Sequence, residues 1–467
     1  MRKLVALACL SLAAAGLCAR FSAAAFTSST AVTANAVTVD ALSNYFSVSP
    51  GTAVQPGTST AVASGNVDAL ALDFGTVPSA RTFTSVFHVT NVSGAAQTAT
   101  LTVSSVPQVT SAVFASSGAG SATLASGAST TVTVTTSSTV AGRGAGTVRF
   151  GLSSIGWLYR DYSLRIDEAP EAAGAPSALQ KPAGLIDLSW TASSTTTNLA
   201  GYDLYRSSGA GYTKLNATPL TATVYSDTAT ADGTTYTYKV RAVSSGSPVL
   251  ESLDSPIVTA TADATAPGQP TGIGLANGGG AGGAYINAAN TSSLGISVSL
   301  PAGSLTTDTV RVTISNGGNS VTATTSGSPG AGTVTVSGIG VSGLGDGGVT
   351  ITATSTDLAG NISTTGTATF TKDTVAPGAP TAVYTDNVNA ADQISGSAEA
   401  GAAITATRTA PAPTSSYSTT ATGAYSMLVA ATNGKPNASI AVTYTITARD
   451  AAGNTSAVTT LNYTDVR

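Results

Sequence analysis

Residues 294–300 read Leu294-Gly-Ile-Ser-Val-Ser-Leu300, a segment in which aliphatic residues alternate with Gly or Ser. Alternate side chains of a β-strand point to opposite faces, so this period of two predicts a strand with one buried face and one wet face. The same alternation returns at short intervals, in Leu70, Leu72 and Phe74; Val132 and Val134; Val310, Val312 and Ile314; Val349 and Ile351; and Ile440, Val442, Tyr444 and Ile446. Short strands of this kind, separated by Gly, Asn, Asp or Ser, are typical of antiparallel β-sandwiches.

The composition favours the same fold. Only 9% of the 467 residues are charged, against roughly 25% in an average soluble protein. Thr and Ser must therefore supply most of the surface polarity, and the β-branched Thr and Val suit strands better than helices. An apolar content of 42% argues against disorder. We therefore predict an all-β chain of tandem sandwiches.

Repeated linkers divide the chain. Asp263-Ala-Thr-Ala-Pro-Gly-Gln-Pro-Thr271 closely matches Asp373-Thr-Val-Ala-Pro-Gly-Ala-Pro-Thr381, and Glu168-Ala-Pro-Glu-Ala-Ala-Gly-Ala-Pro-Ser177 is a weaker copy. Proline resists joining a sheet, so each copy predicts a short, extended joint. We expect sandwiches at residues 66–168, 174–262, 266–375 and 376–467, after a lead-in segment at 26–65.

The N-terminus has the pattern of a secretory signal peptide at residues 1–25. Arg2 and Lys3 precede an apolar run over 4–17, and Ala23-Ala-Ala25 offers a cleavage site. The run is too short to predict a membrane span. Both cysteines, Cys9 and Cys18, leave with this segment, so the mature chain should lack disulfides. These features predict a secreted, or cell-surface, protein without a transmembrane segment in its mature chain.

Removal of the predicted signal peptide leaves 16 Lys and Arg against 23 Asp and Glu, because three basic residues are lost with it. Binding to nucleic acid needs clustered basic residues, so we expect no such partner.

Residues suited to catalysis are scarce. His88 is the one histidine of the chain, and it is out of phase with the apolar Phe87 and Val89, so it should face solvent. Neither a Ser-His-Asp nor a zinc constellation can be assembled around it. Gly338-Ile-Gly-Val-Ser-Gly343 matches a dinucleotide-binding fingerprint by letter, but a strand pattern follows where the motif needs a helix. We therefore predict no catalytic or cofactor-binding residues, and no enzyme.

Residues 174–262 resemble a fibronectin type III domain. The segments Ile186-Asp-Leu-Ser-Trp190, Gly201-Tyr-Asp-Leu-Tyr-Arg206 and Gly233-Thr-Thr-Tyr-Thr-Tyr-Lys-Val-Arg-Ala242 are similar to the B, C and F strands of that family. The resemblance implies structural roles for Trp190 and Tyr202 in the core and for Tyr236 as the tyrosine-corner residue.

Residues 376–465 resemble bacterial immunoglobulin-like domains that are repeated in large surface adhesins. The likeness lies in Ile394-Ser-Gly-Ser-Ala-Glu-Ala-Gly-Ala-Ala-Ile404 and in Ala448-Arg-Asp-Ala-Ala-Gly-Asn-Thr-Ser456, and Thr356-Asp-Leu-Ala-Gly-Asn-Ile-Ser363 closes the preceding domain in a related way. Leu72-Asp-Phe-Gly-Thr-Val77 and Phe87-His-Val-Thr-Asn-Val-Ser93 are similar to a looser Ig-like group of exported bacterial proteins. Other surface proteins, or a polysaccharide, are the partners that this resemblance implies.

Calcium is the one metal that the resemblance suggests. In related adhesins it stiffens joints between domains, and Asp357, Asp373 and Asp450 lie at such domain ends. Ca²⁺ needs six to eight oxygen ligands. The alternative is that these aspartates cap turns. Seven Asn-x-Ser/Thr sequons also occur, as chance allows in a chain so rich in Ser and Thr: Asn91, Asn216, Asn290, Asn361, Asn437, Asn454 and Asn462.

Three functions remain open on the sequence. The first is a structural or adhesion protein that acts as a spacer or a protein–protein interaction module. The second is a carbohydrate-binding accessory protein of extracellular polysaccharide degradation, which needs a row of exposed aromatic residues; the candidates are Tyr159, Tyr162, Tyr212, Tyr225 and Tyr417. The third is a self-associating fibre subunit, because Phe26-Thr-Ser-Ser-Thr30 is similar to the mature start of camelysin-like biofilm subunits, which donate an N-terminal strand. An unstructured lead-in is the alternative reading of that segment.

Overall fold

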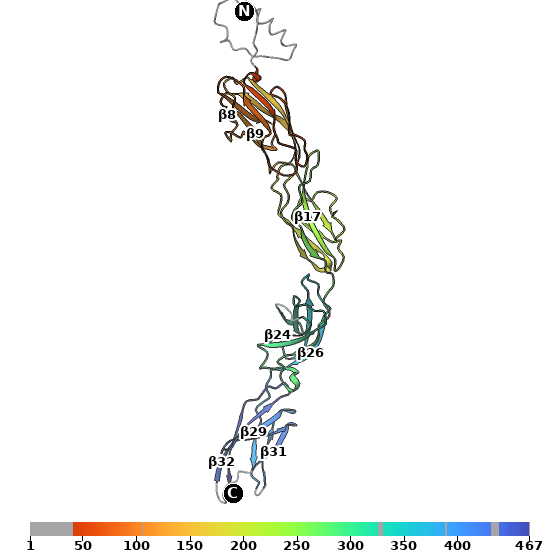
Figure 1. Cartoon of the computed structure of the whole chain (residues 1–467). Helices are drawn as coiled ribbons and strands as arrows, with labels where there is room; N and C mark the ends of the chain where they lie inside the picture. The colour runs from red at the N-terminus through yellow and green to blue at the C-terminus, as the bar shows by residue number, and fades with distance from the viewer. Residues whose placement is uncertain (1–40, 105, 326–329, 388–389, 431–438, 467) are drawn as a thin grey trace, which may run out of the picture. The chain divides into compact units, whose positions relative to one another are not determined.

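The computed structural model describes residues 41–466, apart from 105, 326–329, 388–389 and 431–438 (Figure 1). The strands in these residues form eight sheets, which pair into four sandwiches. The predicted all-β tandem fold is therefore confirmed. The sandwiches belong to two compact units: the first includes Ile186–Thr230 and Thr234–Ala262, and the second includes Gln180–Leu185, Ala231–Gly233 and Asp263–Arg467. The predicted signal peptide lies outside the described residues.

The first sandwich packs a sheet in the order β1-β5-β9-β4, with β7 also on β9, against the sheet β2-β3-β11-β10-β6-β8. The strands are β1 (Phe46–Pro50), β2 (Ala63–Gly65), β3 (Leu70–Val77), β4 (Thr82–Phe83), β5 (Phe87–Asn91), β6 (Gln97–Ser104), β7 (Val109–Phe114), β8 (Ser121–Leu124), β9 (Ser129–Thr136), β10 (Gly142–Leu152) and β11 (Tyr159–Glu168). Strand β11 is parallel to β3 and antiparallel to β10.

The first sandwich begins earlier than the expected boundary at residue 66. Strands β1 and β2 belong to it, and the 3₁₀ turn η2 (Leu42–Asn44) places Leu42 in its core. Phe46 is fully buried, and its ring meets that of Phe150 edge-on at 5.3 Å between centroids. Because β1 pairs with β5 of its own sandwich, residues 46–50 form their strand pairing within the chain rather than with a neighbouring molecule. Of the lead-in segment suggested as a donated strand, residues 26–40 lie outside the described residues.

The second sandwich packs the sheet β12-β13-β16 against the sheet β15-β14-β17-β18. Its strands are β12 (Ser177–Gln180), β13 (Ile186–Ser189), β14 (Leu199–Ser207), β15 (Thr213–Lys214), β16 (Val224–Asp227), β17 (Thr235–Ser244) and β18 (Val258–Thr261), with the turn η3 (Pro182–Gly184). The structure buries Trp190, Tyr202 and Tyr236 in this core. Trp190 packs edge-on against Tyr202 at 5.8 Å, and the Tyr202 hydroxyl accepts a hydrogen bond from the Ser193 amide.

The second unit holds the third and fourth sandwiches. The third consists of β19-β21-β24 and β20-β26-β25-β22-β23, and the fourth of β27-β28-β31 and β30-β29-β32-β33. The strands are β19 (Thr271–Leu275), β20 (Tyr285–Ile286), β21 (Leu294–Leu300), β22 (Thr309–Asn316), β23 (Asn319–Thr324), β24 (Gly332–Ile339), β25 (Gly347–Thr356), β26 (Gly366–Lys372), β27 (Val383–Thr385), β28 (Asp392–Ser397), β29 (Ala403–Ala410), β30 (Ser415–Thr420), β31 (Ala424–Val429), β32 (Ser439–Arg449) and β33 (Thr459–Val466), with the turn η4 (Ala281–Gly283).

Hydroxyl-bearing residues cover the outer faces of the larger sheets. In the third sandwich, Thr313 on β22 lies opposite Thr322 on β23 and Thr352 on β25, and Thr350 lies opposite Thr369. The Oγ1 atoms of Thr313 and Thr322 are 3.0 Å apart, at hydrogen-bonding distance. Such rows keep a solvent-facing sheet polar without charge, which explains how a chain with so few charged residues can expose large sheets.

The glycine-rich segment at 338–343 runs from the end of β24 towards β25, so the strand–turn–strand arrangement expected there is present. The dinucleotide-binding motif needs a helix after its glycines, and the element that follows this segment is the strand β25. Among the described residues, no helix is long and apolar enough to cross a membrane.

Candidate functional site at the joint of the second unit

The two copies of the Asp-x-Ala-Gly-Asn sequence form the same tight loop. In the copy at 450–454, the Asp450 amide donates to the Asn454 carbonyl at 3.1 Å, and the Gly453 amide donates to the Asp450 carbonyl at 3.2 Å. The copy at 357–361 repeats both bonds at 3.1 and 3.2 Å. Gly453 has φ +92°, a left-handed conformation that side chains disfavour. The loop therefore requires glycine at this position.

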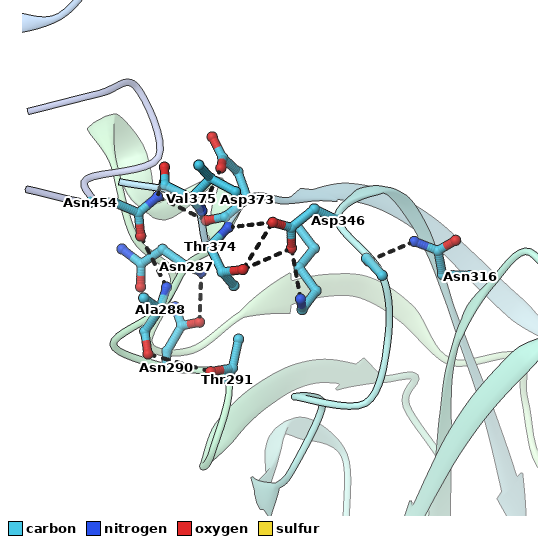
Figure 2. A network of polar contacts seen from close by, with 12 residues as sticks. Asn287, Ala288, Asn290, Thr291, Asn316, Asp346, Asp373, Thr374, Val375 and Asn454 are labelled. Carbon is cyan, nitrogen blue, oxygen red and sulfur yellow. Dashed lines mark hydrogen bonds and ion pairs between the residues drawn. The ribbon is translucent and has the colours of Figure 1, made fainter. Parts of the chain in front are cut away.

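The Asn454 side chain connects this loop to the rest of the second unit (Figure 2). Its Nδ2 donates to Asp450 Oδ2 and to the Asp373 carbonyl, both at 2.9 Å. Its Oδ1 accepts a hydrogen bond from the Ala288 amide at 3.0 Å. Asp373 lies in the linker and Ala288 in the third sandwich, so one buried amide joins three segments that are far apart in sequence.

The third sandwich contributes a matching asparagine. Asn287 Nδ2 donates to the Ala452 carbonyl at 2.8 Å, and Asn287 Oδ1 accepts from the Ala289 amide at 3.1 Å. Asn290 Oδ1 in turn accepts from the Asn287 amide at 2.9 Å. The loop after β20 is therefore fixed by its own hydrogen bonds and also reaches across to the fourth sandwich.

The linker is anchored to the third sandwich by a buried lysine. Lys372, which is 4% exposed, places its Nζ 2.7 Å from Asp346 Oδ1. Asp346 Oδ2 accepts hydrogen bonds from the Thr374 amide at 3.0 Å and from the Thr374 hydroxyl at 2.9 Å (Figure 2). The hydrogen bond from Lys372 is the main cause that holds the pKa of the Asp346 carboxyl below its usual range. The start of the linker is thus held in place ahead of the Asn454 contact.

Asn361, in the other copy of the loop, makes the corresponding contacts. Its Nδ2 donates to Asp357 Oδ2 at 2.9 Å and to the Asp263 carbonyl at 3.0 Å. Its Oδ1 accepts from the Ala183 amide at 2.9 Å, within the segment Gln180–Leu185 that is part of the second unit. The two asparagines therefore have the same role: each binds the aspartate that opens its own linker.

The three aspartates suggested as calcium ligands have other contacts in this structure. Asp357 and Asp450 bind the asparagine of their own loop through both carboxylate oxygens, and Asp373 Oδ1 accepts from the Val375 amide at 3.1 Å. Asp373 and Asp450 meet at Asn454, whereas Asp357 belongs to the other loop. Over the part of the chain that the structure describes, no three His, Cys, Asp or Glu side chains are grouped to hold a metal ion. Calcium at these positions stays a prediction.

Several sequon asparagines are structural. Asn91, Asn216, Asn290, Asn361 and Asn454 are all at most 8% exposed. Their amides are engaged in hydrogen bonds, as with Asn91 Nδ2 to the Leu124 carbonyl at 2.8 Å. The serine at the third position is also used, because Ser456 Oγ accepts from the Ala448 amide at 2.9 Å. These five sequons therefore reflect loop architecture rather than accessible acceptor sites.

The candidate aromatic residues do not form a row. Tyr162 is buried in the first core, and Tyr159 lies on the outer side of the same sandwich. Tyr212 and Tyr225 belong to the second sandwich and Tyr417 to the fourth. Sequence reasoning missed Trp157, which is 47% exposed and lies two residues from Tyr159. In the sequence, Trp157 and Tyr159 flank the aliphatic Leu158, and this alternation was the signal that could have pointed to Trp157. The structure buries Leu158 between them.

No family model matches the chain, and no curated protein does. Among solved structures, an Fn3-like protein from Clostridium thermocellum is 35% identical over 20% of this chain and 91% of its own length, with a TM-score of 0.17. The FN1–FN3 domains of chicken CNTN1 are 12% identical over 64% of this chain and 99% of their own length, with a TM-score of 0.29. The tetra-tandem repeat in the extending region of a large adhesion protein is 20% identical over 83% and 96%, with a TM-score of 0.22.

The chain is an all-β protein of tandem sandwiches. The solved structures that it resembles are fibronectin type III proteins and bacterial adhesin repeats, so the resemblance expected from the sequence is confirmed.

Proposed function

We propose that the chain is a non-catalytic, secreted or cell-surface spacer that carries interaction modules for adhesion. The observation that supports this most is the joint between the third and fourth sandwiches, which asparagine side chains hold together. The side chains of Asn361 and Asn454 connect consecutive segments of the chain. The Nδ2 of each asparagine donates to the aspartate of its own loop and to a carbonyl in the preceding linker. Side chains that are buried and saturated with hydrogen bonds fix architecture and are not free to act on a substrate.

A spacer works only if its joints resist bending. The joint in the second unit closes on both sides, since Asn454 reaches Ala288 and Asn287 reaches Ala452. Buried hydrogen bonds of this kind are expensive to leave unmade, so bending the joint exposes or orphans several polar groups at once. The neutral hydroxyl faces of the third sandwich fit a protein that is exposed to solvent on many sides.

The distance distribution across this joint tests the proposal. We would place spin labels at Ser320→Cys on β23 and Thr460→Cys on β33, in a chain that begins at residue 26 and so lacks both cysteines. A stiff joint gives a narrow distribution, and Asn454→Ala should broaden it. Asn462→Ala, an exposed asparagine on β33, is the matched control and should not. A distribution that is already broad in the unsubstituted joint would contradict the spacer.

Electron microscopy of the same chain separates the spacer from the fibre subunit. Single particles support the spacer, and filaments that grow from purified protein would favour strand donation by residues 26–40.

A further inference from the structure

An exposed aromatic pair lies at the end of the β10–β11 hairpin in the first sandwich. Trp157 is 47% exposed and Tyr159 is 36% exposed, whereas Leu158 between them is 3% exposed. Trp157 lies in the turn that precedes β11, and Tyr159 is the first residue of β11, so the two exposed aromatic residues are separated only by the buried Leu158. The chain has two tryptophans, and the other, Trp190, is buried in the second core. Tryptophan is highly buried on average, and at protein surfaces it is enriched at binding hot spots.

A glycine and an arginine fix the position of Tyr159. Gly151 lies directly opposite Tyr159 in the ladder, and a Cβ on Gly151 would be 3.0 Å from the Cβ of Tyr159. The absence of that Cβ leaves room for the tyrosine beside β10. The Arg149 guanidinium lies 3.8 Å from the centre of the Tyr159 ring. Arg149 also binds Asp161 in a bidentate pair, with Nε–Oδ1 at 2.8 Å and Nη2–Oδ2 at 2.9 Å. Tyr159, Arg149 and Asp161 therefore form one preorganised stack.

The charged residues along the sheet that carries this stack form ion pairs. The sheet carries four arginines and four aspartates in contact with one another, out of 42 charged residues in the whole chain: Arg143, Arg149, Arg160, Arg165, Asp68, Asp73, Asp161 and Asp167. Each of these arginines is paired with an aspartate, so the ion pairs add no net charge that would attract an anion. Each pair still has unused hydrogen-bonding capacity, because a guanidinium has five N–H donors and a carboxylate has about four acceptor sites.

We propose that the Trp157 face, defined as Trp157, Tyr159, Arg149 and Asp161, binds a neutral polysaccharide. The C–H faces of sugar rings pack on Trp157, and the Arg149–Asp161 pair donates to and accepts from neighbouring hydroxyls. An apolar partner would not use the ion pairs, and an anionic one would meet Asp161 without a free cation in compensation. The inference deepens the adhesion role proposed above, for which it names the class of surface that the chain holds.

Tryptophan fluorescence of the full chain tests this directly. The probes are soluble mixed-linkage β-glucan, xylan and dextran as neutral polysaccharides, and polygalacturonate as the anionic comparison. Binding should shift the emission of Trp157 and shield it from acrylamide, while the buried Trp190 contributes a constant background. Trp157→Ala lacks the fluorescent reporter, so its binding and that of the unsubstituted chain are compared by isothermal titration calorimetry. The variant should bind about tenfold or more weakly, as removal of an aromatic anchor does at hot spots.

Two further variants make the result specific. Arg149→Lys keeps the charge and loses the planar fork, so we expect weaker binding, by about threefold to tenfold. Tyr212→Ala removes a comparably exposed tyrosine, 39% against 36% for Tyr159, from another sandwich and should leave binding unchanged. Circular dichroism confirms that each variant folds. The proposal is overturned by absent binding to all three neutral polysaccharides, by preference for polygalacturonate, or by full binding in Trp157→Ala. None of these outcomes alters the distance distribution at the Asn454 joint, so the spacer is tested separately.

Discussion

The two units join their sandwiches by different means. In the first unit, Val140 and Thr197 form a parallel bridge, in which the Thr197 amide donates to the Thr139 carbonyl at 3.0 Å and the Ala141 amide to the Thr197 carbonyl at 3.1 Å. Side chains support this bridge, as where Asn198 Nδ2 donates to the Ala141 carbonyl at 2.9 Å. In the second unit, the hydrogen bonds described across the joint come from the side chains of Asn454 and Asn287. Any residue except proline can form the backbone bridge, whereas only a side chain with a donor and an acceptor can replace asparagine.

This difference explains why one joint is visible in the sequence and the other is not. Asn454 and Asn361 belong to a repeated motif, because the loop needs Asp, Gly and Asn at fixed positions. The bridge at Val140 leaves no comparable pattern. We therefore expect single side-chain changes at the joint to lower the stability of the second unit. The stability of the first unit should depend mainly on the residues buried beside its joint.

Glu168, the last residue of β11, gives the largest expected effect. It is fully buried, and this burial raises the pKa of its carboxyl to about 8, with Glu171 acting in the same direction and Thr136 and Arg81 against it. Between about pH 4.5 and 8 the folded protein keeps this proton and the unfolded chain releases it. The free energy of unfolding of the first unit should therefore fall as pH rises through this window, by about 3–5 kcal/mol, and level off above it.

Urea denaturation followed by tryptophan fluorescence measures this change, since both tryptophans belong to the first unit. Glu168→Gln should flatten the pH dependence. Glu399→Gln, an exposed glutamate in the second unit, should leave it as it is. An equal slope in Glu168→Gln and the unsubstituted protein would show that the buried carboxyl is not its source.

Asn454→Ala gives the next largest effect. It removes the side-chain partner of Asp450 Oδ2, the Asp373 carbonyl and the Ala288 amide, and we expect the fourth sandwich to lose about 2–4 kcal/mol. Hydrogen exchange of β32 peptides measures the loss. Asn462→Ala is the control, because Asn462 is exposed and its side chain accepts a hydrogen bond from the Thr443 hydroxyl at 2.9 Å. Equal protection in the two variants would mean that the joint adds nothing to stability.

Gly453→Ala separates backbone strain from crowding at the same joint. Its added Cβ would lie 2.9 Å from Arg449 Nη2 and 3.0 Å from the Gly280 amide nitrogen, at φ +92°. Gly423→Ala has a similar φ of +101° and open space around its Cβ. We expect Gly453→Ala to cost about 1–2 kcal/mol more than Gly423→Ala. Matched losses, measured by thermal melting, would contradict close contact with Gly280.

Thr195→Val in the first unit should have the smallest effect, about 1 kcal/mol. The Thr195 hydroxyl donates to the Ser138 carbonyl at 3.0 Å and accepts from the Glu171 amide at 2.9 Å, but the backbone bridge beside it remains. Thr102→Val, at an exposed strand position, is the control, and tryptophan fluorescence is the measurement. A loss as large as that of Asn454→Ala would remove the contrast between the two joints.

The fold was largely predictable because its cause is local. Leu294, Ile296 and Val298 alternate with polar neighbours, and the structure buries all three in one core. The start of the first sandwich was not predictable, since β1 is five residues long and Phe46 is buried through its contact with Phe150, about a hundred positions away. The Asp-x-Ala-Gly-Asn loop was visible as a turn, yet the two partners of Asn454 outside that loop come from segments that the sequence does not connect to it.

The sequence by itself determined the tandem all-β architecture, the fibronectin-like second sandwich, the neutral Thr-rich surface and the scarcity of catalytic residues, because each follows from composition or from a period of two. Only the tertiary structure decided that Asn454 joins Ala288 to Asp373, that Glu168 is buried, that Trp157 is exposed, and that Arg149 lies over the Tyr159 ring. The physical reason is that these features depend on register and on contacts between distant segments, which alternation does not encode.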